Sequence, residues 1–530
     1  MAIKRYIAIK DATISNAFDS SLMSNNRATG SNMGASDVLE TFSIYGQASS
    51  GSTELSRILL KFPITGTTSI KADRDADEIP ASGSVRFYLR MYNCPHAFTL
   101  PRDFTLSAYA VSRSWDEGAG LDMEQYSDLD YCNWMYANET TAWSNYGGDY
   151  HTGSYTAGAN LPKYNVSFTE GYEDVELDIT AMVEEWLAAL SDGGNQHRRK
   201  NHGVGLFFSS SMEAFSSSAD DLVSDNSYTP VNDDGAKRSY YTKKFFGRSS
   251  EFFFRRPAIE ARWDASQKDN GGNFYLSSSL ASGDDNLNTL YMYNYVRGQL
   301  KDIPGLSNGI IFLETYKHLT GAATPLTLPV GGGVATDGQS YVTGGAVDSK
   351  TGIYSASFAF TGSDYSKIYP VWLSGSTYAL TGLDPIQFFT GSAITVREFP
   401  TSDFNPSPKY ASKITNLKSK YFKDENARIR LYVRQKDWNP TIYTKATSNI
   451  ESEVVEDVYY KVLRAVDELD VVSYGTGSLN HTRASYDASG SYFDFDMSLL
   501  EPGYMYGFKF TYYVNGAYHE QPEIFKFRVE

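Results

Sequence analysis

The sequence has very little cysteine and no long apolar run. Its only two cysteines are Cys94 and Cys132. A small secreted scaffold held by disulfides carries several cysteine pairs, so we expect two buried free thiols rather than a disulfide framework. No apolar stretch approaches the length that a membrane-spanning helix needs, so we expect no membrane partner.

The sequence also has a deficit of basic residues. It contains 47 Lys and Arg against 63 Asp and Glu, a formal net charge of -16. Nucleic-acid binding depends on basic surface that contacts phosphates, so we expect no nucleic-acid partner. The first ten residues alternate like a strand and do not resemble a secretory signal peptide. We therefore expect synthesis in a cytoplasm without export by the usual route, which is compatible with release by lysis.

Aromatic residues are abundant and follow the pattern of β-strands. They make up 15% of the chain, with 40 Tyr and 30 Phe, and aromatic side chains favour pleated sheets. Residues 84–91 and 428–433 alternate between apolar and polar, as half-buried strands do. Only residues 180–190 read clearly as a helix, because Ile179, Met182, Val183, Trp186 and Leu190 recur on one helical face. The pattern predicts an all-β protein of tandem sandwiches, the first with one short helix.

Composition suggests two boundaries between domains. Residues 265–273 form a polar linker rich in Gly and Asn. Three prolines fall within residues 398–408, and proline interrupts both helices and central strands. We therefore predict three domains, residues 1–264, 265–400 and 401–530.

The last segment carries signals of an immunoglobulin-like sandwich. A Pro502-Gly503 turn leads into alternating aromatic residues, and a tyrosine often occupies such a corner in these folds. Asn515-Gly516 predicts a tight hairpin, because this pair accepts the positive φ angles of a type I′ turn. Residues 523–529 read as a final strand. We predict immunoglobulin-like sandwiches for both later domains, although the middle segment follows the plan less clearly.

The first half contains a series of short motifs in a characteristic order. They are Asp11-Ala12-Thr13-Ile14, an Asn/Gly/Ser-rich stretch over 25–36, Arg57-Ile58-Leu59-Leu60-Lys61-Phe62, Trp115-Asp116-Glu117-Gly118, the helix and strand of 177–206, and the closing pieces at 246–251 and 256–259. Together they resemble the DNRLRE-type β-sandwich module over residues 1–264. The hexapeptide that names the family is absent, and long insertions occur around 120–165 and 211–243.

The resemblance implies a non-catalytic module with a structural or sugar-binding role. Such modules occur in bacterial surface proteins and in virion proteins of marine tailed phages. The expected function is that of a virion structural protein of the neck, tail or baseplate that docks to other virion proteins and forms a homo-oligomer. The alternative is a carbohydrate-binding adhesion module that contacts host glycans.

A Gly-rich loop near residue 118 is a candidate calcium site. Asp116, Glu117 and Asp122 lie close together in the sequence, and Ca²⁺ takes six to eight oxygen ligands. The spacing does not match an EF-hand loop. The alternative is a solvated acidic loop without a metal, and no other cofactor is expected.

An aromatic-rich segment over residues 126–150 is the candidate contact site for a glycan or protein partner. Exposed aromatic rings offer flat faces for sugars and are enriched at protein interfaces. The candidates are Tyr131, Trp134, Tyr136, Trp143 and Tyr146. The alternative is a long loop folded over the sandwich, with these rings buried.

Recognisable catalytic motifs are missing from the sequence. The 7 histidines show no metal-ligand spacing, and no nucleophile elbow or phosphate-binding loop occurs. We therefore expect no enzymatic activity. A polysaccharide-degrading enzyme remains a third alternative, because paired carboxylates are identified only by their separation in space.

Overall fold

The computed structural model describes most of the chain. The described residues are 2–19, 27–45, 53–97, 102–151, 164–191, 199–216, 228–306, 309–319, 341–347, 350–362, 364–375, 385–398, 408–436 and 453–530. The chain divides into two compact units, an N-terminal unit of Ile3–Trp263 and a C-terminal unit of Asp264–Glu530 with the first two residues. The division into three domains stays a prediction, and its second boundary, at 399–407, lies outside the described residues.

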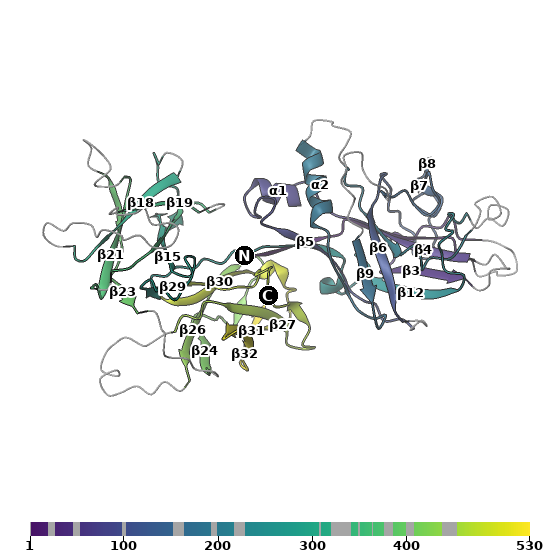
Figure 1. Ribbon diagram of the computed structural model, residues 1–530. Helices are drawn as coiled ribbons and strands as arrows, with labels where there is room; N and C mark the ends of the chain where they lie inside the picture. The colour runs from purple at the N-terminus through teal and green to yellow at the C-terminus, as the bar shows by residue number, and fades with distance from the viewer. Residues whose placement is uncertain are drawn as a thin grey trace. The chain divides into compact units, whose positions relative to one another are not determined.

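The N-terminal unit is built from two antiparallel sheets (Figure 1). The smaller sheet has the order β1 (Ile3–Ile7), β13 (Ala258–Arg262), β5 (Arg86–Met91) and β10 (Val175–Asp178). The larger sheet has the order β12 (Ser239–Phe246), β3 (Val38–Tyr45), β4 (Thr53–Lys61), β11 (Val204–Phe208), β6 (Phe104–Ala110) and β9 (Tyr164–Phe168), and β2 (Lys10–Ser15) pairs with β4. All five residues of β11 are buried, which is expected of a strand between two neighbours in a packed sheet.

Helix α2 (Thr180–Ser191) matches the helix that periodicity predicts. The Asp178 Oδ1 accepts a hydrogen bond from the Thr180 backbone N–H at 2.9 Å, so Asp178 supplies the cap. Met182, Val183 and Trp186 are buried as expected, but Leu190 is exposed. A second helix, α1 (Ile70–Asp75), was not predicted, because its six residues are too short to show an apolar period.

The C-terminal unit begins with a sandwich formed by one curled sheet. Its strand order is β14 (Phe274–Tyr275), β23 (Ile394–Arg397), β21 (Lys367–Leu373), β18 (Ile310–Tyr316), β19 (Val342–Ala346), β20 (Ile353–Ala359) and β15 (Leu287–Tyr293), with β22 (Gln387–Thr390) beside β21. Phe274 and Leu290 come from opposite ends of this order yet share one buried core. The sheet must therefore fold over on itself to enclose that core.

Two sheets form the second sandwich of the C-terminal unit. One has the order β24 (Tyr410–Ile414), β26 (Asn426–Gln435), β30 (Gly490–Asp496) and β29 (Ser485–Asp487); the other has β25 (Lys420–Tyr421), β33 (Phe525–Val529), β31 (Met505–Val514), β27 (Val458–Arg464) and β28 (Asp470–Val472), with β32 (Ala517–Glu520) beside β31. Tyr460 of β27 stacks on Phe493 of β30, with ring centroids 4.1 Å apart, so the two sheets face each other across an aromatic core.

Two predicted turn features are present in this sandwich. The Tyr506 hydroxyl donates a hydrogen bond of 2.7 Å to the Glu501 carbonyl, which is the contact of a tyrosine corner. Asn515 and Gly516 both have positive φ, 54° and 77°, as a type I′ hairpin requires.

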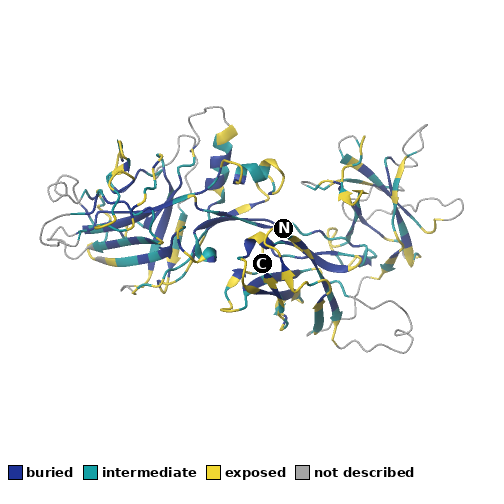
Figure 2. Ribbon diagram, turned by 180° about the vertical axis from the view of Figure 1, so that it is seen from behind, coloured by how far each residue is buried: buried dark blue, intermediate teal, exposed yellow. Residues whose placement is uncertain are grey.

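The fold class is therefore confirmed as all-β with tandem sandwiches. Figure 2 shows buried residues along the strands, while exposed residues gather on turns and loops. No helix in the described part of the chain is long and apolar enough to cross a membrane. Cys94 and Cys132 are both free thiols, but only Cys132 is buried, so the expectation of two buried thiols was wrong for Cys94, which is partly exposed.

Candidate functional site

Three of the separate sequence motifs meet at the side chain of Glu117 in the N-terminal unit. Its Oε1 accepts hydrogen bonds from the Asp11 backbone N–H at 2.7 Å and from Arg248 Nε at 2.7 Å. Its Oε2 accepts from the second arm of the Arg248 guanidinium at 2.5 Å. Because planar guanidinium and carboxylate groups match in this two-point geometry, the contact orients both loops firmly. Glu117 therefore serves as a structural clamp.

Asp11 lies buried beside this clamp. Its Oδ2 accepts a hydrogen bond from the Arg248 backbone N–H at 2.6 Å, and its side chain is fully buried. Burial raises the pKa of Asp11 to about 7, with the nearby Glu117 carboxylate adding to the rise and the Arg248 contacts opposing it. The clamp consequently contains a carboxyl group that titrates near neutral pH.

Arg57, from the Arg-Ile-Leu-Leu motif on β4, forms a buried ion pair with Glu213. Two hydrogen bonds of 3.0 and 2.9 Å join the guanidinium to the carboxylate, and both side chains are 8% exposed. The guanidinium also lies 4.2 Å from the Phe207 ring centroid and 5.5 Å from that of Trp134. The Arg57 guanidinium is engaged by the Glu213 carboxylate and the aromatic rings, so it is not positioned to bind a ligand.

The Trp115 and Gly203 motifs also have structural roles. The Trp115 indole N–H donates to the His202 carbonyl at 2.8 Å. Gly203 has a φ of +107°, and a Cβ placed there would lie 2.1 Å from the Leu60 carbonyl oxygen. Only glycine permits this close approach of β11 to β4.

The three candidate calcium ligands are tied to different partners. Asp116 lies 3.3 Å from Lys10 Nζ, Glu117 is bound to Arg248, and Asp122 Oδ1 accepts the backbone N–H groups of residues 124–126. Over the described ranges, no group of three or more His, Cys, Asp or Glu side chains is placed to hold a metal ion. The candidate calcium site is thus not assembled, and the geometry fits the alternative of an acidic loop.

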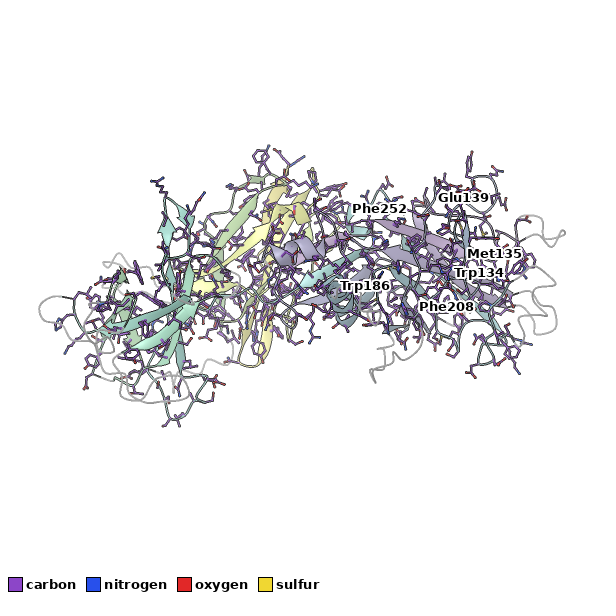
Figure 3. All side chains as sticks on the ribbon, turned by 90° about the horizontal axis from the view of Figure 1, so that it is seen from above. Trp134, Met135, Glu139, Trp186, Phe208 and Phe252 are labelled. Carbon is purple, nitrogen blue, oxygen red and sulfur yellow. The ribbon has the colours of Figure 1, made fainter. Side chains whose placement is uncertain are left out.

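The two tryptophans among the predicted contact residues are buried rather than exposed. Trp134 donates its indole N–H to the Tyr228 carbonyl, and Trp143 donates to the Asn133 carbonyl, both at 2.9 Å. Both rings belong to one hydrophobic core cluster, against which Tyr146 packs. In Figure 3, Trp134 lies in the same region as Glu139, which is exposed on the turn between β7 (Tyr136–Asn138) and β8 (Thr141–Ala142). The tryptophans therefore cannot stack on a ligand in this conformation.

Tyr131 and Tyr136 do remain accessible, each 41% exposed. They are joined by Tyr126 of the same aromatic-rich segment, which is 64% exposed, and by Leu121 and Leu129, which sequence reasoning missed and which are 51% and 65% exposed. Their position among acidic residues is the sequence feature that could have indicated that these side chains are exposed. Residues 116–131, here called the acidic loop, contain six Asp and Glu and no Lys, Arg or His.

The acidic loop is held in place by a dense set of hydrogen bonds around Asn32. The Asn32 amide donates to the carbonyls of Glu117 and Cys132 at 2.6 and 2.7 Å. Its Oδ1 accepts from the backbone N–H groups of Gly34 and Gly120. Within the loop, the Leu121 N–H donates to the Tyr126 carbonyl at 2.8 Å. The exposed apolar side chains are therefore presented on a preorganised frame.

A separate groove of about 570 Å³ lies between α1 and α2. Four of its charged lining residues form two ion pairs. Arg74 forms two hydrogen bonds of 2.7 Å with Glu184, and Lys71 bonds Asp75 at 2.6 Å. The first pair joins the two helices, and the second lies within α1.

Comparisons with known proteins do not assign the chain to a family. No protein-family model and no curated protein matches it. Similar solved structures include the N-terminal Ig1-2 module of Drosophila receptor protein tyrosine phosphatase DLAR, which is 10% identical over 46% of this chain and 91% of that chain with a TM-score of 0.14. Others are the FN1-FN3 domains of chicken CNTN1 (10% identical, 55% and 82% covered, TM-score 0.14) and an ICAM-5 D1-D4 fragment (9% identical, 54% and 64% covered, TM-score 0.11). At these TM-scores the likenesses carry no argument.

Proposed function

We propose that this protein is a non-enzymatic structural protein of a phage virion, located in the neck, tail or baseplate, which docks to other virion subunits. The resemblance of residues 1–264 to the DNRLRE-type module supports the virion context. The tandem sandwiches support a docking role, because their loops and edges are available to partners while their cores are closed.

The observation that carries the docking role is the acidic loop. It exposes Leu121, Tyr126, Leu129 and Tyr131 on a frame fixed by Asn32 and Asp122. Exposed apolar and aromatic side chains gathered on one site mark interaction surfaces. A rigid loop also loses little conformational entropy on binding, which leaves more of the contact energy for affinity.

Quantitative mass spectrometry of gradient-purified phage particles from the source culture tests the virion role. We expect a fixed copy number per particle, in multiples of three, six or twelve, as symmetric virion assemblies require. Absence of the protein from intact particles would reject the virion role.

A matched pair of variants tests whether the acidic loop does the docking. Tagged Tyr126→Asp/Leu129→Asp protein, produced in infected cells, should be excluded from particles, because charge replaces the apolar contact. Leu280→Asp is the control, since Leu280 is 80% exposed in the C-terminal unit. Equal incorporation of the two proteins would remove the acidic loop from the docking surface.

The second candidate function is a carbohydrate-binding adhesion module. The accessible rings of Tyr131 and Tyr136 favour it, because aromatic faces can pack on sugar rings. A glycan array probed with the wild type and with Tyr131→Ala/Tyr136→Ala decides between the candidates. Glycan binding by the wild type that the double variant loses would support adhesion. If the wild type binds no glycan, docking is the candidate function that remains.

A further inference from the structure

A strongly basic segment occurs in this otherwise acidic chain. Residues 409–436 contain nine Lys and Arg but only two Asp and Glu, in a chain of net charge -16. The segment includes β24 and β26, which pair antiparallel in the second sandwich of the C-terminal unit. β24 ends the strand order of its sheet and is therefore an edge strand.

Several of these basic residues are neutralised within the sandwich. Arg428 pairs with Asp494 at 2.7 Å, and Arg430 pairs with Asp487 at 2.8 Å. Four others, nearer the edge, have no ion pair with any described residue: Lys409, Lys413, Arg434 and Lys436. Within the described part of the chain, no carboxylate neutralises their charges.

The strand register places Lys413 and Arg434 on one face. Lys409 and Lys436 flank the same ends of the two strands, where the Lys436 backbone N–H donates to the Lys409 carbonyl at 2.7 Å, and both side chains are exposed. Ala411 lies opposite Arg434, and Lys413 lies opposite Tyr432. The alternate residues Ile414 and Val433 are buried, so they point into the sandwich, and Lys413 and Arg434 point outward. We call Lys409, Lys413, Arg434 and Lys436 the cationic strand face.

The acidic loop and the cationic strand face are complementary in charge. The loop carries six carboxylates and no basic residue, and four of its side chains are exposed and apolar. Two of the carboxylates, Asp116 and Glu117, pair with Lys10 and Arg248, so the other four carry the charge of the loop. The strand face carries cations that pair with no carboxylate among the described residues, and Tyr432 and Ala411 lie beside them. Two copies of an acidic protein repel each other in general, so a local patch of opposite charge such as this one favours a specific contact between them.

We propose that the acidic loop of one copy docks on the cationic strand face of a second copy. The inference rests on the proposed docking function and names the partner of its acidic loop. Because the two surfaces differ, the contact is heterologous, and its repetition produces a closed ring or an extended array. A loop against two strands is a small interface, so a dissociation constant on the order of micromolar is expected.

Sedimentation of the full-length protein over a range of concentrations measures the association. We expect concentration-dependent oligomers at about 0.15 M salt that dissociate at about 1 M, because salt screens exposed charge pairs. Lys413→Glu/Arg434→Glu should weaken association at least about tenfold, since like charges then face each other. Lys301→Glu/Lys367→Glu is the control, because both lysines are exposed elsewhere in the C-terminal unit and the net charge changes equally.

Charge exchange distinguishes this contact from a general electrostatic effect. Glu124→Lys/Asp130→Lys should also weaken association, and a mixture of this protein with Lys413→Glu/Arg434→Glu should associate again. Asp122 is left unchanged because it caps the loop. Unaltered circular dichroism and melting temperatures establish that each variant is folded.

Carbodiimide crosslinking of mixed ¹⁴N and ¹⁵N chains identifies the contact directly. Crosslinks between peptides of the acidic loop and of 409–436 should include pairs that join a light to a heavy chain. A monomer at every concentration, crosslinks only within one chain, or failure of the mixed variants to associate would each overturn the inference. A fixed copy number in particles combined with any of these results would leave the proposed virion function standing.

Discussion

Replacing Arg57 with methionine should strongly destabilise the N-terminal unit. The Arg57–Glu213 pair is joined by two hydrogen bonds, and each side chain is only 8% exposed. Removal of the guanidinium leaves the Glu213 carboxylate buried without its counter-charge. Breaking one side of a buried ion pair costs about 3–5 kcal/mol, and the lost contacts with Phe207 and Trp134 act in the same direction.

Urea unfolding followed by tryptophan fluorescence measures this change. Trp115, Trp134, Trp143, Trp186 and Trp263 lie in the N-terminal unit, which accounts for five of the 7 tryptophans. The signal therefore reports mainly on the unit that carries the substitution, even if the other unit unfolds separately.

The double variant Arg57→Met/Glu213→Leu provides the control. It removes both charges and keeps apolar volume, so its stability should lie within about 1 kcal/mol of the wild type, since such replacements are often neutral. A loss below about 1 kcal/mol for Arg57→Met alone would refute the reasoning. So would a double variant that is as unstable as the single one.

Three further predictions concern pH, burial and backbone conformation. Burial raises the pKa of Asp11 to about 7, so its proton is held more tightly in the folded state than in the unfolded state. The resulting stabilisation is complete below about pH 4 and is lost as the pH rises through about 7. The melting temperature of the wild type should therefore fall between pH 5 and 8, and Asp11→Asn should reduce that fall. An unchanged pH profile in the variant would contradict this. Trp143→Ala should lower the free energy of unfolding by about 3–5 kcal/mol, and Tyr136→Ala should lower it by less than about 0.5 kcal/mol, as measured by urea unfolding. The difference is expected because the Trp143 ring is buried and the Tyr136 ring is exposed. Equal losses of stability would argue against the burial of Trp143. Gly203→Ala should cost about 2 kcal/mol or more in the same assay, because its φ of +107° and the nearby Leu60 carbonyl leave no room for a Cβ; a neutral effect would show that β11 can move away from β4.

Features that depend on neighbouring residues could be predicted from the sequence. Helix α2 follows from the spacing of Met182, Val183 and Trp186, and the Asn515-Gly516 turn follows from a pair that tolerates positive φ. Strands β5 and β26 follow from alternation. These features are set by local periodicity and backbone preference, which the sequence displays directly.

The candidate site was harder to predict, because its contacts join distant parts of the chain. Glu117 and Arg248 are 131 positions apart in the sequence, and nothing in the Trp-Asp-Glu-Gly motif distinguishes a clamp from a metal ligand. Trp134 and Tyr131 are three residues apart in one aromatic-rich segment, yet only the tryptophan is buried. Composition alone favoured them equally as contact residues.

The sequence by itself determined the all-β class, the main helix and the sharp turns of this protein, because each depends on side-chain periodicity or on the φ angles of one or two residues. Tertiary structure alone decided which acidic and aromatic side chains are buried or ion-paired and which are exposed to solvent. Burial and ion pairing depend on residues brought together from across the chain, so the sequence alone does not show that Leu121 and Tyr126 are exposed or that Lys413 lies beside Tyr432 on a strand face.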